Sequence, residues 1–281
     1  MKSFGRVALV ANFAKAQVPE LAAELRGVAE QDGVAVVTHS EYPLPVGALA
    51  GCDLCVTLGG DGTLLGAVPE AAARDVPVLG INRGKLGFLA NYPAENAAAE
   101  FRAVLRGEFQ FSPRALLECA DADDAGGSGA GAALAPAPAL ALNDVAVSAE
   151  NRSGMSRLRV FHNGEFVNSF LCDGLVVATP TGSTAYNLSA GGPLIEPQAD
   201  LFVLSPICPH TLSARPLLFQ RGGVLRIEEE LPGRGRLDIE VDGSRSQAVL
   251  PLEIRLSERR LRLVQPRGFS HFNLLRTKLR W

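Results

Sequence analysis

Two glycine-rich segments carry the side chains with the most evident chemical potential, and the first is LGGDGTLL, residues 58–65. One carboxylate, Asp61, stands there among three glycines. Glycines let the backbone approach a ligand closely, and successive backbone N–H groups in such a turn can bind phosphate. The segment therefore predicts a phosphate-binding turn made by Gly59, Gly60, Gly62 and Thr63.

Asp61 has two interpretations. A carboxylate that faces phosphate is repelled unless it takes up a proton or holds a metal ion. Alternatively, Asp is a frequent N-cap, and Asp61 could simply cap a helix that follows the strand. The common nucleotide loops do not decide the matter: residues 80–85 are one residue short of a Walker loop, and no G-x-G-x-x-G follows a strand.

The second segment, CDGLVVATPTGSTAYNLSAGGP, covers residues 172–193. Its apolar strand runs into a loop of hydroxyl groups and glycines, which suits the sugar and base edges of a nucleotide. Tyr186 could flank a purine or pack as an ordinary core tyrosine. A third segment, Leu142–Val145, places the Asn143 amide beside the Asp144 carboxylate. This pair suits vicinal ribose hydroxyls, although an Asx-turn would use the same residues.

Composition excludes several classes. The chain has 281 residues, a net charge of −3 and 47% apolar residues, and it lacks the basic patch of a nucleic-acid binder. The apolar run at the N-terminus stops at Asn12, and no stretch approaches the roughly 20 residues that span a bilayer. Five scattered cysteines predict packed thiols, Cys52-x-x-Cys55 included, rather than disulfides or a metal site. We therefore expect a cytoplasmic protein without nucleic-acid or membrane partners.

Periodicity predicts how these segments are positioned. The first hundred residues alternate between strands and helices, which indicates a parallel sheet covered by helices. The expected strands are 6–10, 34–37, 52–58 and 76–81, and the expected helices are 19–30 and 94–105.

After residue 107 nearly every segment has strand character, and Asn163-Gly164 predicts a tight hairpin. The sequence therefore predicts a Rossmann-like α/β domain over residues 1–110 and a β-rich domain over 111–266. The tail, 267–281, is expected to return to the first domain. Residues 121–139 are rich in Gly, Ala and Pro and are expected to form a disordered loop. The expected strands of this half are 115–120, 140–148, 158–161, 165–170, 175–179, 201–204, 224–230, 236–241 and 250–264.

Taken together, the motifs resemble the NAD kinase family over nearly the whole chain. They are LGGDGTLL, GINRGKLGFLA, ALNDVAV, DGLVVATPTGSTAYNLSAGGP, PICPHTLSARPL and FNLLRTKLRW, in that order. GGDGT alone is weakly discriminating, since lipid kinases and phosphofructokinases have similar versions, whereas TPTGSTAYNLSAGGP is specific. The resemblance implies an α/β domain and a β-rich domain with the site between them, commonly in homodimers or homotetramers.

The same resemblance implies roles for individual residues. Asp61 matches the general base that accepts the proton of the adenosine 2′-hydroxyl, and the product would be NADP. The expected donor is ATP or polyphosphate, with a divalent metal such as Mg²⁺ carried by the nucleotide and no metal ligands from the protein. The residues that match the family's NAD contacts are Asp61, Gly62, Phe88, Asn143, Asp144, Asp173, Thr184, Ala185, Tyr186, Asn187, Leu188 and Ser189.

Two other functions stay open on the sequence alone. A lipid kinase would share GGDGT, but it should present a membrane-binding surface, and the second half offers no evident amphipathic anchor. A non-catalytic dinucleotide sensor would keep the pocket, although the presence of Asp61 and Asn143 argues for a reaction.

Overall fold

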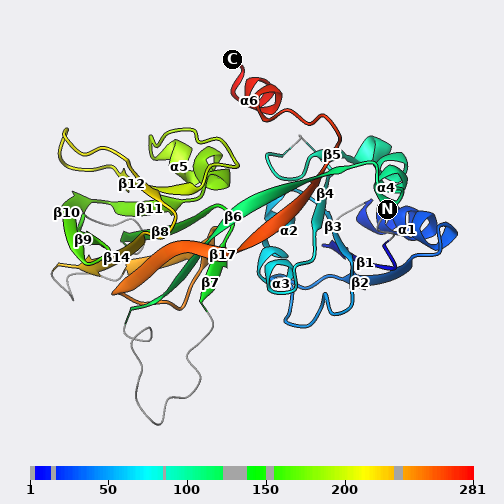
Figure 1. The fold of residues 1–281 in the computed structure, drawn as a ribbon, viewed down its shortest axis with the longest axis horizontal. Coiled ribbons are helices and arrows are strands. Elements are labelled where there is room, and N and C mark those ends of the chain that lie inside the picture. Colours follow the sequence, from blue (N-terminus) through cyan, green and yellow to red (C-terminus); the bar gives the residue numbers. More distant parts are fainter. Residues whose placement is uncertain (1–3, 14–16, 85–86, 123–137, 150–154, 231–236) are drawn as a thin grey trace, which may run out of the picture. The chain divides into compact units, whose positions relative to one another are not determined.

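A computed structural model describes residues 4–13, 17–84, 87–122, 138–149, 155–230 and 237–281. The chain forms two compact units (Figure 1). Unit 1 comprises residues 1–113 and 260–281, and unit 2 comprises residues 114–259. Most of the expected loop at 121–139 lies outside the described residues. None of the helices in the described ranges has the length and apolar character needed to cross a membrane.

Unit 1 contains a parallel sheet in the order β2-β1-β3-β4-β17, with β5 beside β4. Its strands are β1 (Arg6–Ala11), β2 (Ala35–His39), β3 (Leu54–Leu58), β4 (Val78–Asn82), β5 (Tyr92–Pro93) and the last part of β17 (Leu252–Gln265). The helical segments are α1 (Val18–Gln31), α2 (Asp61–Leu65), α3 (Val68–Ala73), η1 (Ala94–Asn96), α4 (Ala97–Leu105) and α6 (His271–Leu279).

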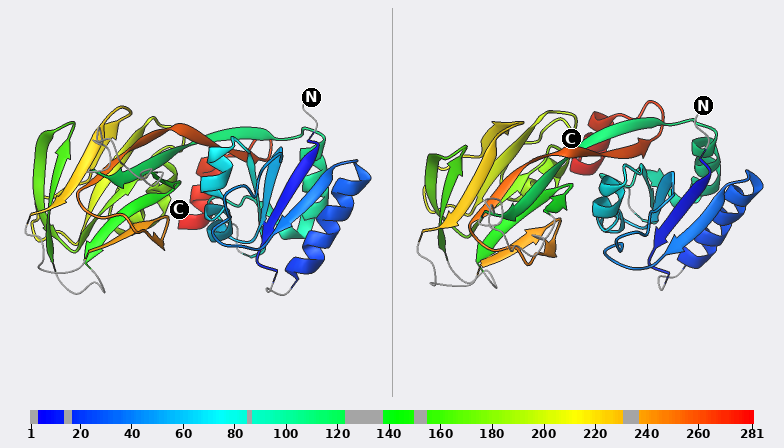
Figure 2. Two further views of the ribbon diagram at one scale, coloured as in Figure 1. Left: turned by 90° about the horizontal axis from the view of Figure 1, so that it is seen from below. Right: turned by 60° about the horizontal axis from the view of Figure 1, so that its bottom comes forward.

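The core of unit 1 explains why β3 and β4 read as continuous apolar runs. Every residue of both strands except Thr57, Gly80 and Asn82 is apolar, and all are buried. Alternate side chains of β1, β3 and β4 pack with α1 and α4, which lie on one face of the sheet (Figure 2). A strand covered on both faces carries little of the alternation seen in half-exposed strands.

Unit 2 is built from two antiparallel sheets whose facing side chains form a single core. One sheet has the order β13-β12-β11-β8-β15-β16, and the other joins β10-β9-β14 to the first part of β17, with β6 and β7 alongside. The strands are β6 (Gln110–Asp121), β7 (Ala139–Ala141), β8 (Asp144–Ala149), β9 (Ser156–His162), β10 (Glu165–Cys172), β11 (Gly174–Ala178), β12 (Leu201–Ile207), β13 (Leu217–Gln220), β14 (Val224–Glu229), β15 (Leu237–Val241) and β16 (Ser244–Arg245). The segment after β11 forms η3 (Thr181–Thr184) and α5 (Tyr186–Ser189).

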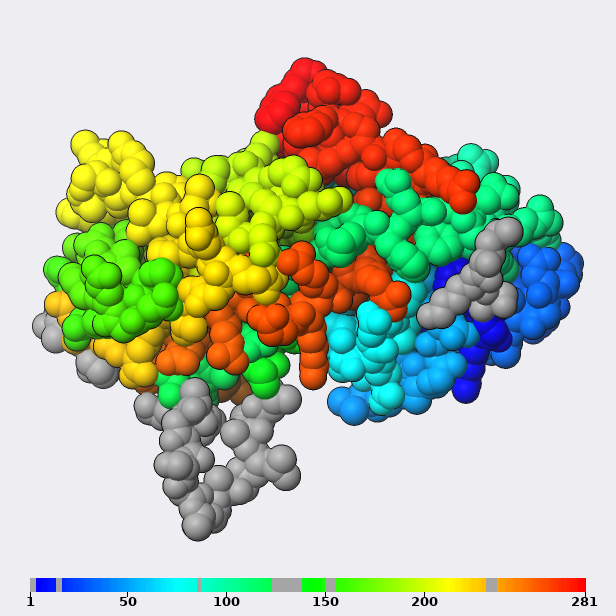
Figure 3. Space-filling model, viewed as in Figure 1, coloured from blue at the N-terminus to red at the C-terminus, as the bar shows by residue number. Residues whose placement is uncertain are grey.

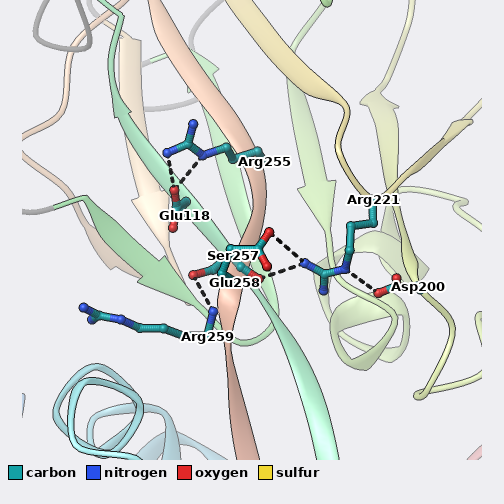
Figure 4. A network of polar contacts seen from close by, with 7 residues as sticks. All are labelled: Glu118, Asp200, Arg221, Arg255, Ser257, Glu258 and Arg259. Atoms are coloured by element: carbon teal, nitrogen blue, oxygen red, sulfur yellow. Dashed lines mark hydrogen bonds and ion pairs between the residues drawn. The ribbon is translucent and has the colours of Figure 1, made fainter.

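A polar network joins three parts of unit 2 (Figure 4). Arg221, just after β13, makes an ion pair with Asp200 at 2.7 Å. Its guanidinium also donates to the backbone carbonyl of Ser257 in β17 at 3.1 Å. This arginine therefore links the edge of one sheet to a strand of the other.

The fold class expected from the sequence is confirmed: an α/β first part, a β-rich second part, and a tail that belongs to unit 1. The tail forms α6, which lies at the surface, drawn in red in Figure 3, with Phe272 exposed. The predicted hairpin is also confirmed, since β9 and β10 pair directly across Asn163 and Gly164, both at positive φ.

One expected strand differs. Residues 140–148 were expected to be continuous, but the structure has β7 and β8, separated by Leu142 and Asn143. The backbone N–H groups at this break bond to a side chain from β15–β16 instead of to a neighbouring strand.

Candidate active site

Asp61 lies at the carboxyl end of the parallel sheet, where open α/β sheets bind ligands. It is the first residue of α2, directly after β3 and two glycines. Its side chain does not cap this helix, so the N-cap interpretation is wrong. Instead, the carboxylate bonds to the segment that follows β4, the strand next to β3.

Three backbone N–H groups hold the Asp61 carboxylate. Oδ2 accepts from Phe88 at 2.9 Å, and Oδ1 accepts from Leu89 at 3.1 Å and from Ala90 at 3.0 Å. A carboxylate has about four lone-pair directions. Oδ1 therefore has both of its positions filled, whereas Oδ2 keeps one for another hydrogen-bond donor.

Gly87 makes this arrangement possible. A Cβ atom at position 87 would lie 2.0 Å from Asp61 Oδ1, far inside van der Waals contact. The residue next to it, Phe88, is half-buried, and the ammonium group of Lys278 in α6 lies 5.7 Å from its ring centroid. The structure thus brings the predicted residues Asp61 and Phe88 together.

A cavity of about 280 Å³ opens beside α2 in unit 1. Gly62 and Thr63 of the glycine-rich segment line it, together with residues that follow β1 and β2. Of the four predicted phosphate contacts, Gly59 uses its N–H for the carbonyl of Ile81 at 2.9 Å. Gly60 and Gly62 are exposed at the turn, and the cavity gives room for an anion next to Gly62. The remaining lining residues are Val10, Ala11, Asn12, Ser40, Glu41, Tyr42 and Gly66.

In unit 2, Asn143 lies in the break before β8, Asp144 is the first residue of β8, and several hydrogen bonds fix this turn. The backbone N–H of Thr179 donates to the Asn143 carbonyl at 2.9 Å, and the Thr179 hydroxyl donates to the Leu142 carbonyl at 2.5 Å. Gly182 approaches so closely that a Cβ atom there would lie 2.0 Å from the Asn143 carbonyl oxygen. The structure therefore joins the ALND segment to the start of TPTGSTAYNLS.

Asp144 has an unusual electrostatic environment. Burial raises the pKa of its carboxyl group to about 7, and the nearby charges of Asp242 and Glu240 act in the same direction. The backbone N–H of Tyr186 donates to this carboxylate and opposes the shift in pKa. Perturbed carboxyl groups of this kind are common at functional sites.

The segment 184–189 covers the outer face of the β8-β11-β12 sheet. Tyr186 packs against Ala146, Val176 and neighbouring apolar residues, so its packing role is real. Asn187 is fully buried, and its amide donates to the carbonyls of Ser183 and Pro193 while accepting from Ser205. The side chain of Asn187 thus holds the loop together.

The other members of this segment differ in exposure. Thr184, Ala185 and Leu188 are half-buried, and Ser189 is exposed. Thr181, one turn earlier, is 6% exposed, and its hydroxyl oxygen has no hydrogen-bond partner among the described residues. A ligand hydroxyl or amide would satisfy this oxygen, which sequence reasoning had not singled out.

Asp173 is not close to the other predicted residues of unit 2. It precedes β11, and Asn143, Asp144 and Thr179 lie at the other end of that strand. The five residue steps from 173 to 178 correspond to about 17 Å of extended chain.

Two further residues complete the site but carried no local signal. Asp242 accepts three N–H groups from the turn at 142–144, and Gly87 leaves space for the Asp61 carboxylate. In the sequence, Asp242-Gly243 looks like an ordinary hairpin turn.

Comparison with known proteins shows the family to which the chain belongs. The profile of the ATP-NAD kinase N-terminal domain matches residues 46–109, and that of the ATP-NAD kinase C-terminal domain matches residues 142–264. The chain belongs to the NAD kinase family. The NAD kinase of Variovorax paradoxus (strain S110) is 39% identical to it, over 96% of this chain and 87% of that protein. The NAD kinase of Polaromonas naphthalenivorans (strain CJ2) is 38% identical, over 97% of this chain and 90% of that protein.

Solved structures of NAD kinases have the same fold. Yeast NADH kinase, crystallised with NADH, superposes with a TM-score of 0.79 at 25% identity, over 98% of this chain and 86% of that one. An NAD kinase from Archaeoglobus fulgidus in complex with ATP has a TM-score of 0.77 at 28% identity and covers 98% of both chains. The resemblance drawn from the motifs is thereby confirmed.

Proposed function

We propose that Asp61 is the general base with which this NAD kinase deprotonates the 2′-hydroxyl of the adenosine ribose. The enzyme phosphorylates NAD with ATP. The 2′ oxygen forms a bond to the γ-phosphorus while the bond from that phosphorus to the β–γ bridging oxygen breaks, and ADP leaves. The proton of the hydroxyl passes to Asp61.

The fixed carboxylate supports this assignment. Because Oδ1 already accepts two N–H groups and Oδ2 accepts one, Oδ2 is the atom that receives the proton. Phosphoryl transfer depends mainly on positioning and on stabilisation of charge. A carboxylate held by three backbone N–H groups meets the first requirement.

The phosphate donor is assigned to the cavity beside α2. Gly60 and Gly62 offer a turn that an anion can approach, and Thr63 contributes a hydroxyl. Glu41 lies on the same wall, so a bound triphosphate needs a cation to offset the repulsion. Within the described ranges no group of three or more His, Cys, Asp or Glu side chains is arranged to hold a metal. A divalent ion such as Mg²⁺ that arrives with the nucleotide would supply the cation.

Unit 2 is assigned to recognition of NAD. Asn143 and Asp144 provide an amide and a carboxyl group for ribose hydroxyls, and Tyr186 provides a half-buried ring. The neighbouring residues Thr184, Ala185, Leu188 and Ser189 are exposed enough to contact the dinucleotide, whereas Asn187 acts through the loop. Asp173 contacts a part of the ligand distant from these groups. Oligomeric state and cytoplasmic location stay predictions.

The decisive experiment compares Asp61→Asn with Asp53→Asn. Asp53 is a matched control because its carboxylate also accepts backbone N–H groups, from Gly5 at 2.8 Å and Arg6 at 2.9 Å, but it precedes β3. Loss of a general base lowers turnover by about 10²–10⁴. We expect D61N to form NADP more slowly by this factor while its affinity for NAD stays nearly unchanged. D53N is expected to keep wild-type turnover. A D61N enzyme with near wild-type turnover would refute the assignment.

A further inference from the structure

Asp242 stands at the turn between β15 and β16 and reaches across to β8. Its Oδ1 accepts from the backbone N–H of Asn143 at 2.7 Å and of Asp144 at 3.2 Å. Its Oδ2 accepts from the N–H of Leu142 at 2.8 Å. The backbone N–H of Asp242 in turn donates to the Asp144 carbonyl at 3.0 Å. Asp242 therefore bonds to residues 142–144 through both its side chain and its backbone.

The turn in which Asp242 lies does not explain these contacts. A two-residue hairpin with a type I′ turn needs positive φ at both positions, and Asp242 and Gly243 have φ of 49° and 72°. Asn or Gly would serve there equally well. Neither would supply a carboxylate to three N–H groups that lie 98 to 100 residues earlier in the chain. The side chain of Asp242 is half-buried, and withdrawing a carboxylate from water is costly, so its presence calls for a role beyond the turn.

We propose that Asp242 is a positioning residue for NAD binding, which fixes the backbone of residues 142–144 and thereby the directions of the Asn143 and Asp144 side chains. This inference rests on the proposed function, in which those two side chains bind the dinucleotide. Asp242 itself is not assigned a contact with the ligand.

Charge gives the inference a second, independent consequence. The groups that act on the Asp144 carboxyl are the carboxylates of Asp242 and Glu240 and the N–H of Tyr186. After burial, the charge of Asp242 is the largest cause that raises the pKa of Asp144. Asp242→Asn removes that charge, so the pKa of Asp144 falls. Any pH dependence of NAD affinity that comes from Asp144 then moves to lower pH.

The test compares Asp242→Asn with Asp238→Asn. Asp238 lies in β15, the strand that leads into the Asp242 turn, and its carboxylate makes an ion pair with Arg245. Replacing a charged acceptor of backbone N–H groups weakens binding of a ligand held by that turn by about tenfold or more. We expect D242N to raise the dissociation constant for NAD by that factor, to shift its pH midpoint downward and to leave the KM for ATP unchanged. D238N keeps wild-type values.

Asn143→Ala, measured in parallel, separates the two levels of the proposal. If N143A binds NAD as tightly as the wild type, the proposed NAD site is wrong. If N143A weakens binding but D242N keeps both the wild-type affinity and the wild-type pH midpoint, the positioning role alone is overturned. Thermal unfolding checks that each variant is folded. Should D242N fail to fold, Asp242→Glu retains the charge but displaces the carboxylate by one methylene, and wild-type NAD affinity in D242E would overturn the proposal.

Discussion

Gly87→Ala tests whether the position of the Asp61 carboxylate sets the rate. The new Cβ atom would stand 2.0 Å from Oδ1, 2.7 Å from Cγ and 2.9 Å from Oδ2 of Asp61. Carbon and oxygen atoms that are not bonded rarely approach closer than about 3 Å, so the carboxylate or the segment 88–90 has to move by about 1 Å. That movement breaks or lengthens the hydrogen bonds that fix the carboxylate.

The expected loss follows from this displacement. A misplacement of about 1 Å at a reacting group costs about 10²-fold in rate, or about 2.7 kcal/mol in activation free energy. NADP formation is measured at saturating NAD and ATP, so that kcat is compared rather than affinity. Gly84→Ala is the matched control, because among the described residues a Cβ atom there meets only Asn82 Oδ1, at 3.9 Å. If G87A and G84A have equal kcat values, the proposed dependence on Asp61 geometry is refuted.

Three further outcomes are expected. Gly182→Ala pushes a Cβ atom against the Asn143 carbonyl, and calorimetry should show NAD affinity reduced by about tenfold or more. Unchanged affinity would show that this loop does not take part in NAD binding. Asn187→Ala leaves the buried Ser205 hydroxyl without its acceptor, and urea unfolding should show a loss of about 1–3 kcal/mol, whereas a wild-type midpoint would contradict the network. Arg221→Met removes the ion pairs of Arg221 with Asp200 and Glu258 (Figure 4) and should cost about 1 kcal/mol in the same assay; equal stability would show that these pairs contribute nothing.

Periodicity located most elements because buried strands and amphipathic helices leave a local pattern. The helix expected at 19–30 is observed as Val18–Gln31, and the strand expected at 52–58 is observed as Leu54–Leu58. The short helix α3 was not expected, and a helix at α2 was only one of two interpretations of Asp61, since the glycines of residues 59–62 indicate a turn and five or six residues carry too little periodicity.

Site residues could be predicted where the reactive groups lie in one segment of the sequence. Contacts between segments that are distant in the sequence could not be predicted. Asp61 could be singled out as a carboxylate among glycines. Its three N–H donors come from residues 27 to 29 positions later, and no local sequence pattern predicts these hydrogen bonds. The break in the strand expected at 140–148 has the same origin, because Asp242 takes the backbone groups that a continuous strand would give to its neighbour.

Unit 1 cannot complete its sheet early in translation, because β17 contributes residues to both units. Its Leu252–Arg255 portion pairs with β14, and its Leu263–Val264 portion pairs with β4. Domains usually complete themselves in the order in which the ribosome releases them. Here the unit that begins first receives its last sheet strand only after residue 259, when almost the entire polypeptide has emerged. A nascent chain halted before that point would leave Val78 and Leu79 of β4 without their pairing partners in β17, and exposed strand groups of this kind can pair with other chains.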